Sequence, residues 1–95
     1  MKEHSGWQEF ITNCRALTSN EDLSQFFELV LTPSEREKIA ARYQILSQLV
    51  NDKLTQREIA AKIGVSIFNV TRGANQLKLV DDEVKSLLLR GEKCD

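Results

Sequence analysis

Three observations predict an all-α fold of six helices that contains a helix-turn-helix. The 95 residues include one proline and four glycines, and so few helix-breaking residues suit helices. Helix-capping residues recur along the chain, and apolar residues return at steps of three and four positions, which is the helical period. The length fits a single domain over residues 1–95. Within it we expect dimerisation helices in 1–52, a helix-turn-helix in 53–78 and a C-terminal helix in 79–95.

The first two helices are predicted to be rich in large apolar side chains. The first runs from about residue 5 to 17, where the apolar positions are Trp7, Phe10, Ile11, Cys14 and Leu17. Ser19 or Asn20 can cap a second helix over 21–30, in which Phe26-Phe27 places apolar surface on more than one side. A homodimer with exchanged helices would cover that surface. A compact monomer with partly exposed aromatic side chains is the alternative.

The third helix has a strong start signal in Thr32-Pro33-Ser34-Glu35. Threonine is the N-cap, proline takes the first helical position and glutamate takes the capping-box position. This helix is expected to reach about Val50, with an inward face formed by Ile39, Ala40, Tyr43, Leu46, Leu49 and Val50. Residues 51–53 form a turn, and Asp81 or Asp82 caps a last helix through Val84, Leu87 and Leu88.

Between these segments lies the helix-turn-helix pattern. Thr55 and Glu58 form a capping box that begins one helix. Gly64 ends it, because glycine takes the positive φ of a helix end without strain. Ser66 can cap the second helix. Apolar residues recur at helical spacing in both, at Ile59, Ala60, Ile63, Ile67, Val70 and Leu77. The second helix of such a motif commonly lies in the major groove of DNA, although two packed helices without a DNA role remain an alternative.

Charge supports a nucleic-acid partner. Residues 53–78 carry five basic side chains against Glu58 alone, whereas residues 1–31 carry two basic and five acidic ones, and the whole chain has a net charge of −1. Positive charge is therefore concentrated where phosphate contacts are needed. We expect no membrane association and a cytoplasmic location, because no apolar run suits a signal peptide or approaches the roughly 20 residues of a membrane span.

Nothing in the sequence indicates an enzyme, a metal site or a cofactor. Cys14 and Cys94 lie near opposite ends of the chain without metal-ligand spacing, so free thiols in a reducing cytoplasm are favoured over a disulfide. His4 is the only histidine and lies near the terminus. The chain has no Ser-His-Asp set and no glycine-rich phosphate loop.

Four strings together resemble the tryptophan repressor family. They are the segments 31–37, 41–43, 54–58 and 70–78, the last with the sequence Val70-Thr-Arg-Gly-Ala-Asn-Gln-Leu-Lys78. The resemblance covers roughly residues 26–78. It implies an intertwined homodimer that takes L-tryptophan as corepressor and then binds operator DNA of tryptophan biosynthesis or transport genes.

The resemblance also implies a ligand site. Arg42 and Arg72 match the residues that enclose the indole ring, and such stacking is physically reasonable for planar guanidinium groups. Arg72 and Thr32 match the groups that meet the ligand carboxylate. The remaining matches are the backbone carbonyls of Leu29 and Leu31 for the ammonium, Gly73 for close backbone approach, and Gln76 near the amino group. Gln76 departs from the small residue usual there. Alternatively, Arg42 pairs with Glu35 or Glu28, and Arg72 faces phosphate.

Seven residues are candidates for the DNA-binding face. The exposed start of the second motif helix offers Ile67, Phe68 and Asn69 to base edges. Phe68 can contact a thymine methyl group and Asn69 an adenine, or Phe68 packs back on the first motif helix. By resemblance, Arg57 reaches a guanine. Side chains better suited to phosphate are Gln56, Thr71 and Lys78.

Two further hypotheses compete with a tryptophan-responsive repressor. Segment 31–37 also resembles the opening of region four of sigma factors, which suggests a promoter-binding domain. Alternatively, the apolar helices serve a ligand-free dimeric protein-interaction adaptor. DNA binding that depends on tryptophan, DNA binding that does not, and no DNA binding would distinguish the three.

Overall fold

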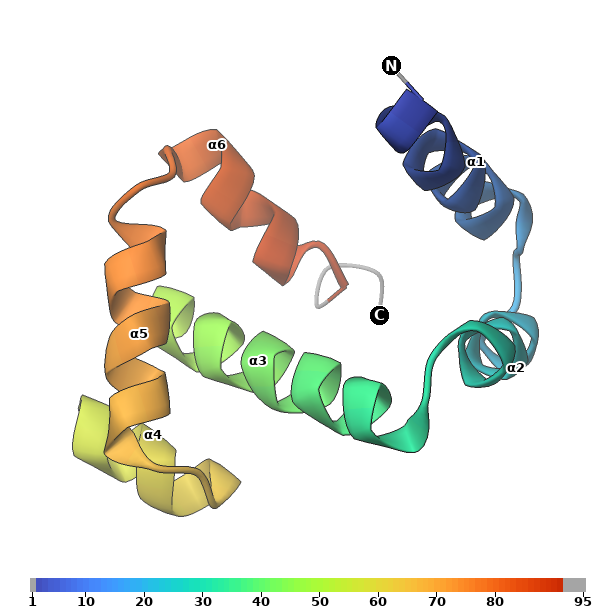
Figure 1. The fold of residues 1–95 in the computed structure, drawn as a ribbon. Coiled ribbons are helices and arrows are strands. Elements are labelled where there is room, and N and C mark those ends of the chain that lie inside the picture. Colours follow the sequence, from blue (N-terminus) through green and yellow to red (C-terminus); the bar gives the residue numbers. More distant parts are fainter. Residues whose placement is uncertain (1, 92–95) are drawn as a thin grey trace. The chain divides into compact units, whose positions relative to one another are not determined.

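The computed structural model describes the backbone of residues 2–91 and the side chains of residues 5–91. These residues form helices and turns with no β-strand (Figure 1). The helices are α1 (Lys2–Ala16), α2 (Asn20–Val30), α3 (Pro33–Asn51), α4 (Gln56–Ile63), α5 (Ile67–Leu77), α6 (Asp82–Lys85) and the 3-10 helix η1 (Ser86–Leu89). The predicted all-α fold is confirmed.

Most helix starts are at the predicted capping residues. The Ser19 hydroxyl accepts a hydrogen bond from the Asp22 amide at 3.0 Å and begins α2. Thr32 and Glu35 form a reciprocal capping box at the start of α3, with donor–acceptor distances of 2.8 and 3.2 Å. The Asp81 carboxylate accepts from the Val84 amide at 3.0 Å and begins α6. Local side-chain chemistry therefore sets these boundaries.

The C-terminal helix differs from its prediction. The α-helix ends at Lys85, after one turn, and residues 86–89 continue as a 3-10 helix. Leu87 is thus on the tighter helix and 59 % exposed. A short apolar pattern does not distinguish the two helix types, because a three-residue step suits both.

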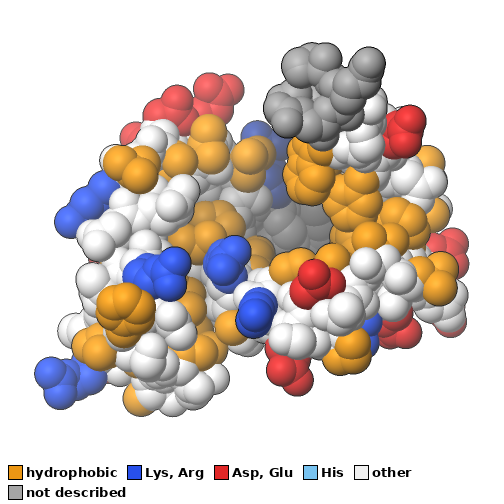
Figure 2. Space-filling model, viewed as in Figure 1, with side chains coloured by type: hydrophobic (Ala, Val, Ile, Leu, Met, Phe, Trp, Pro, Cys, Tyr) orange, Lys and Arg blue, Asp and Glu red, His pale blue; other side chains and the backbone are white. Residues whose placement is uncertain are grey.

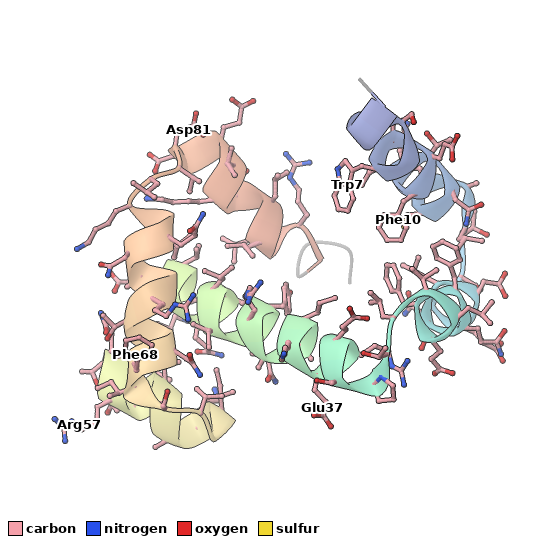
Figure 3. The ribbon with its side chains drawn as sticks, viewed as in Figure 1. Trp7, Phe10, Glu37, Arg57, Phe68 and Asp81 are labelled. Atoms are coloured by element: carbon pink, nitrogen blue, oxygen red, sulfur yellow. The ribbon has the colours of Figure 1, made fainter. Side chains whose placement is uncertain are left out.

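The chain divides into two compact units, an N-terminal unit of residues 1–36 and a C-terminal unit of residues 37–95. The N-terminal unit holds α1, α2 and the first turn of α3. None of its described side chains is buried. Its cohesion comes from aromatic rings: Phe10 lies 5.5 Å from Trp7, 5.7 Å from Phe26 and 5.9 Å from Phe27 between ring centroids. Figure 3 shows Trp7 and Phe10 on the same side of α1.

The C-terminal unit has a small core of its own. Its buried apolar residues are Ile45, Ile59, Ala60 and Val70, and Leu49, Leu54, Ile63 and Val65 pack against them. Ile59 and Val70 are fully buried. Helices α3, α4 and α5 therefore meet around side chains from each of them.

The predicted inward face of α3 is partly wrong for the single chain. Ile39 and Tyr43 are 52 % and 48 % exposed, and Ala40 is exposed as well. Ile45 and Ser47 are the buried positions of this helix instead. The physical reason is that α5 faces a different side of α3, the side that carries Ala41, Arg42 and Ile45, so the face with Ile39 and Tyr43 stays exposed.

Candidate nucleic-acid interface and ligand groove

Helices α4 and α5 form a helix-turn-helix with the predicted boundaries. Thr55 and Glu58 make a complete capping box at the start of α4. Gly64 ends α4 with a φ of 85°, and Ser66 caps α5 by accepting from the Asn69 amide at 3.2 Å. The amides of Gly64 and Val65 both donate to the Ala60 carbonyl, at 2.9 and 3.1 Å. The turn is thereby closed by backbone hydrogen bonds, and the motif is fixed as a unit.

A close crossing joins α5 to α3. A Cβ atom added at Gly73 would lie 2.9 Å from Ile45 Cγ2 and 3.3 Å from Leu49 Cδ1. A larger residue would push the helices apart, since 2.9 Å is below normal van der Waals contact. Gly73 therefore allows α5, the second helix of the motif, to pack tightly on α3, in addition to the ligand role expected from the sequence.

An open groove of about 770 Å³ lies between residues 38–46 of α3 and helix α5. Both helices line it at helical spacing, through Lys38, Ala41, Arg42, Ile45 and Leu46 on α3 and Asn69, Arg72, Gly73 and Gln76 on α5, with Val65 from the turn. Three lining side chains are cationic and none is acidic. On the face drawn in Figure 2, cationic side chains gather over this part of the chain. The groove thus suits an anionic group beside an apolar floor.

Four predicted ligand residues, Arg42, Arg72, Gly73 and Gln76, share this groove. Within the described part of the C-terminal unit, neither arginine forms an ion pair with a carboxylate. The Arg72 guanidinium instead lies over the Phe68 ring, 5.8 Å from its centroid. Two guanidinium groups thus line one groove from different helices, without anionic partners in this unit.

The remaining ligand candidates, Leu29, Leu31 and Thr32, belong to the N-terminal unit. The Leu31 carbonyl accepts a hydrogen bond from Arg36 Nη1 at 2.8 Å, and the same atom lies 3.4 Å from the Glu28 carbonyl. Arg36 therefore already satisfies part of the C-terminal end of α2. Sequence reasoning had not singled out Arg36. The sequence did contain a signal for this role. Arg36 lies one turn into the next helix, eight residues after Glu28, where a cation can reach the carbonyls at the end of α2.

The predicted DNA-facing residues are all on α4, α5 or the residue after α5. Arg57, Ile67, Phe68, Asn69, Thr71 and Lys78 are exposed, and Figure 3 shows Arg57 extending away from α4. The Thr71 hydroxyl donates to Gln56 Oε1 at 2.8 Å, so these two candidates brace the motif helices. Phe68 is 65 % exposed, so the alternative in which it packs back on α4 is wrong.

The structure adds two residues to the groove that the sequence had not indicated for it. Asn69, predicted only as a base-reading residue, lines the groove as well. Lys38 contributes a third cation from α3. Its signal was its position one helical turn before Arg42, on the same face of α3.

Comparison with known proteins decides the family. The family model described as Trp repressor protein matches residues 5–92. The chain belongs to the Trp repressor family. The Trp operon repressor homolog of Chlamydia trachomatis serovar D is 47 % identical over 87 residues, covering 92 % of this chain and 93 % of that protein. The homolog of Chlamydia caviae is 45 % identical, covering 88 % and 83 %. The homolog of Vibrio campbellii is 36 % identical, covering 94 % and 93 %.

Membership in the Trp repressor family settles the class of protein. This is a regulatory DNA-binding family and not an enzyme family. The match extends beyond residues 26–78, on which the resemblance was based, to both helical flanks. It therefore favours this family over a sigma-like domain or an adaptor. Within the described residues, no helix has the length and apolar character to cross a membrane, and no three His, Cys, Asp or Glu side chains gather as metal ligands. Cys14 has a free thiol, whereas His4 and Cys94 lie outside the described side chains.

Proposed function

We propose that this protein is an L-tryptophan-responsive repressor that binds operator DNA of tryptophan biosynthesis or transport genes as a homodimer in the cytoplasm. One observation carries the proposal: Arg42 and Arg72 line the same open groove from α3 and α5. We expect α5, as the second helix of the motif, to be the recognition helix that enters the major groove, so a ligand in this groove would touch the element that reads DNA. L-tryptophan is then the corepressor, and no other cofactor is required.

The groove chemistry supports an aromatic amino acid. An indole ring can stack between two guanidinium planes, each contributing on the order of 0.5–2 kcal/mol. Arg72 also offers N–H donors to a carboxylate. By family likeness, Thr32 assists at the carboxylate and the Leu29 and Leu31 carbonyls accept from the ammonium. Both carbonyls can accept such a bond. Pro33 has no amide hydrogen to donate to the Leu29 carbonyl, and the Leu31 carbonyl keeps a second lone pair in addition to the one that accepts from Arg36.

The homodimer is supported by the N-terminal unit. Its described side chains include Trp7, Phe10 and two further phenylalanines, and none of them is buried. A second copy would remove this aromatic surface from water, at about 25 cal/mol per Å² of apolar area. A dimer also presents two recognition helices to a twofold-symmetric operator.

On DNA, the exposed start of α5 would meet base edges. Phe68 and Asn69 would contact bases there, with Ile67 beside them, and Arg57 would reach a guanine from α4. Gln56, Thr71 and Lys78 would contact phosphates. In the bound state the ligand would fill the space behind α5 and favour one orientation of the motif. It can shift that equilibrium only by its differential affinity for the two states.

Calorimetric titration tests the ligand site directly. The wild-type protein should bind L-tryptophan, and Arg72→Ala should abolish measurable binding with helicity unchanged, because a charge-assisted hydrogen bond contributes about 1.5–3 kcal/mol in addition to stacking. Arg57→Ala is the matched control, since Arg57 is an exposed arginine of the same motif that does not line the groove. It should keep tryptophan binding and lose DNA affinity. Unchanged binding in Arg72→Ala would refute this site.

Ligand analogues separate the two ends of the amino acid. Tryptamine lacks the carboxylate that Arg72 and Thr32 would meet, and indole-3-propionate lacks the ammonium that the Leu29 and Leu31 carbonyls would accept. Both should bind more weakly than L-tryptophan if both ends are recognised. Equal affinity for all three compounds would mean that only the indole ring is bound.

A gel shift and hydrogen exchange test the coupling to DNA. Operator binding should require L-tryptophan, and by linkage the operator must raise tryptophan affinity by the same factor. In an alternative mechanism, the dimer is rigid and tryptophan only adds one contact to a DNA phosphate. Both mechanisms obey the same reciprocity, so affinities alone do not distinguish them. Hydrogen exchange over residues 54–78 distinguishes the two: greater protection with tryptophan supports a mobile motif that the ligand orders, and equal protection refutes it.

A further inference from the structure

Phe68 is an aromatic residue without a core role. It lies in the first turn of α5 and is 65 % exposed. The Arg72 guanidinium carbon lies 5.8 Å from its ring centroid. The two residues are four positions apart on one helix, the spacing at which side chains of neighbouring turns meet. The contact is therefore a cation–π pair on the surface of the recognition helix.

The same Arg72 side chain also lines the groove between α3 and α5. In one and the same conformation, Arg72 therefore contacts the Phe68 ring and lines the groove. A guanidinium group is planar and has two faces and an edge of N–H donors. Because the Phe68 ring contacts one face of the Arg72 guanidinium group, the other face and the edge of N–H donors remain available to a ligand.

We infer that Phe68 is a positioning residue for the ligand site, acting through Arg72. This inference rests on the proposed function, in which Arg72 binds an aromatic amino acid. A free arginine side chain loses considerable rotamer entropy when it is fixed by a ligand. The Phe68 ring restricts Arg72 before the ligand arrives, so less entropy is lost on binding. Ligand affinity in the absence of DNA is thereby raised by a residue on the DNA-facing side of α5.

Calorimetry without DNA tests this role. Phe68→Leu keeps apolar bulk but removes the π face, and it should weaken L-tryptophan binding about two- to fivefold, the range of an exposed cation–π contact. Phe68→Tyr keeps the ring and should restore wild-type affinity. Leu79→Ala is the control for loss of an exposed apolar side chain, since Leu79 is 80 % exposed and outside the groove. A residue that only contacts DNA, or only packs, would not give this pattern.

Proton NMR gives a direct measurement of the pair. The Arg72 Cδ protons should be shifted upfield by the Phe68 ring, and Phe68→Leu should remove that shift. The shift should persist after tryptophan is added, because the ligand is expected to use the other face. Loss of the shift on ligand binding would mean that Phe68 competes with the ligand, and the inference would be wrong.

The outcomes separate this inference from the proposed function. If wild-type protein does not bind L-tryptophan, the proposed function fails and the positioning role fails with it. If Arg72→Ala abolishes binding while Phe68→Leu binds as tightly as wild type, the proposed function stands and only the role of Phe68 is refuted.

Discussion

The two units of this chain differ in how they bury apolar surface. The C-terminal unit closes a core around Ile59 and Val70, both fully buried within one chain. The N-terminal unit has more aromatic rings but buries none of its described side chains, and Trp7 is 58 % exposed. The difference indicates that a single chain supplies the whole core of the helix-turn-helix, whereas the aromatic side chains of α1 and α2 need a further surface to bury them. In our proposal that surface is a second copy.

The largest effect is expected at Phe10, whose ring contacts Trp7 and the two phenylalanines of α2. If a second copy covers this cluster, Phe10→Ala should lower the free energy of unfolding by about 3–5 kcal/mol, as for a fully buried phenylalanine. Denaturation at several protein concentrations measures both the loss and the dimer linkage. A loss below about 0.5 kcal/mol without concentration dependence would show that the cluster is a solvent-exposed surface.

The next effect is expected in the core of the other unit. Ile59→Ala should cost about 2–5 kcal/mol, because a fully buried isoleucine leaves a cavity. Hydrogen exchange should show the loss over residues 56–77, and sedimentation should still give a dimer, because the substitution does not touch the aromatic cluster. Ile67→Ala is the control, since Ile67 is 46 % exposed on the same motif. Dissociation of the dimer in Ile59→Ala would mean that dimerisation depends on the core of the C-terminal unit.

Two glycines allow the same substitution in both units. At Gly73, overpacking against Ile45 costs about 1–3 kcal/mol, offset by a helix-propensity gain of about 1 kcal/mol, so Gly73→Ala should destabilise by about 1 kcal/mol. Nothing lies within 4 Å of a Cβ at Gly6, so Gly6→Ala should stabilise by up to about 1 kcal/mol. Thermal unfolding measures both. Destabilisation by Gly6→Ala would reveal a neighbouring chain at α1.

The same contrast explains what the sequence could predict. At the helix starts, the hydroxyl groups of Ser19, Thr32, Thr55 and Ser66 each accept from the backbone amide three residues later. Because these caps are local, the sequence pattern was sufficient to predict them. The exposure of Ile39 and Tyr43 was missed because periodicity shows that a helix has an apolar face but not which of its faces another element of the same chain covers. The ligand residues came from family likeness, the DNA residues other than Arg57 came from the geometry and chemistry of the motif, and both sets remain proposals.

The residues that line the groove show a similar limit of prediction from sequence. Arg42 and Arg72 were paired by their match to family strings, and they do line one groove. Lys38 belongs to no such string, and its place beside them depends on how α5 crosses α3, a crossing set by Gly73 and Ile45. The stacking of Arg72 on Phe68 was likewise missed, although their four-residue spacing permitted it.

The smallest effect is expected at Lys38, and it tests whether the groove recognises charge or only shape. Lys38 is exposed, so Lys38→Ala should weaken L-tryptophan binding less than about fivefold, in line with the 0.2–1 kcal/mol of exposed ion pairs. Lys62→Ala is the matched control, because Lys62 is an exposed lysine of the same unit outside the groove. Added salt should reduce the difference between Lys38→Ala and wild type, since exposed charges are screened. Tryptamine distinguishes the cause: it has no carboxylate for Lys38 to attract, so its affinity should not fall in Lys38→Ala. An equal loss for tryptamine and L-tryptophan would mean that Lys38 supports the groove through its aliphatic chain and that Arg72 alone supplies the charge.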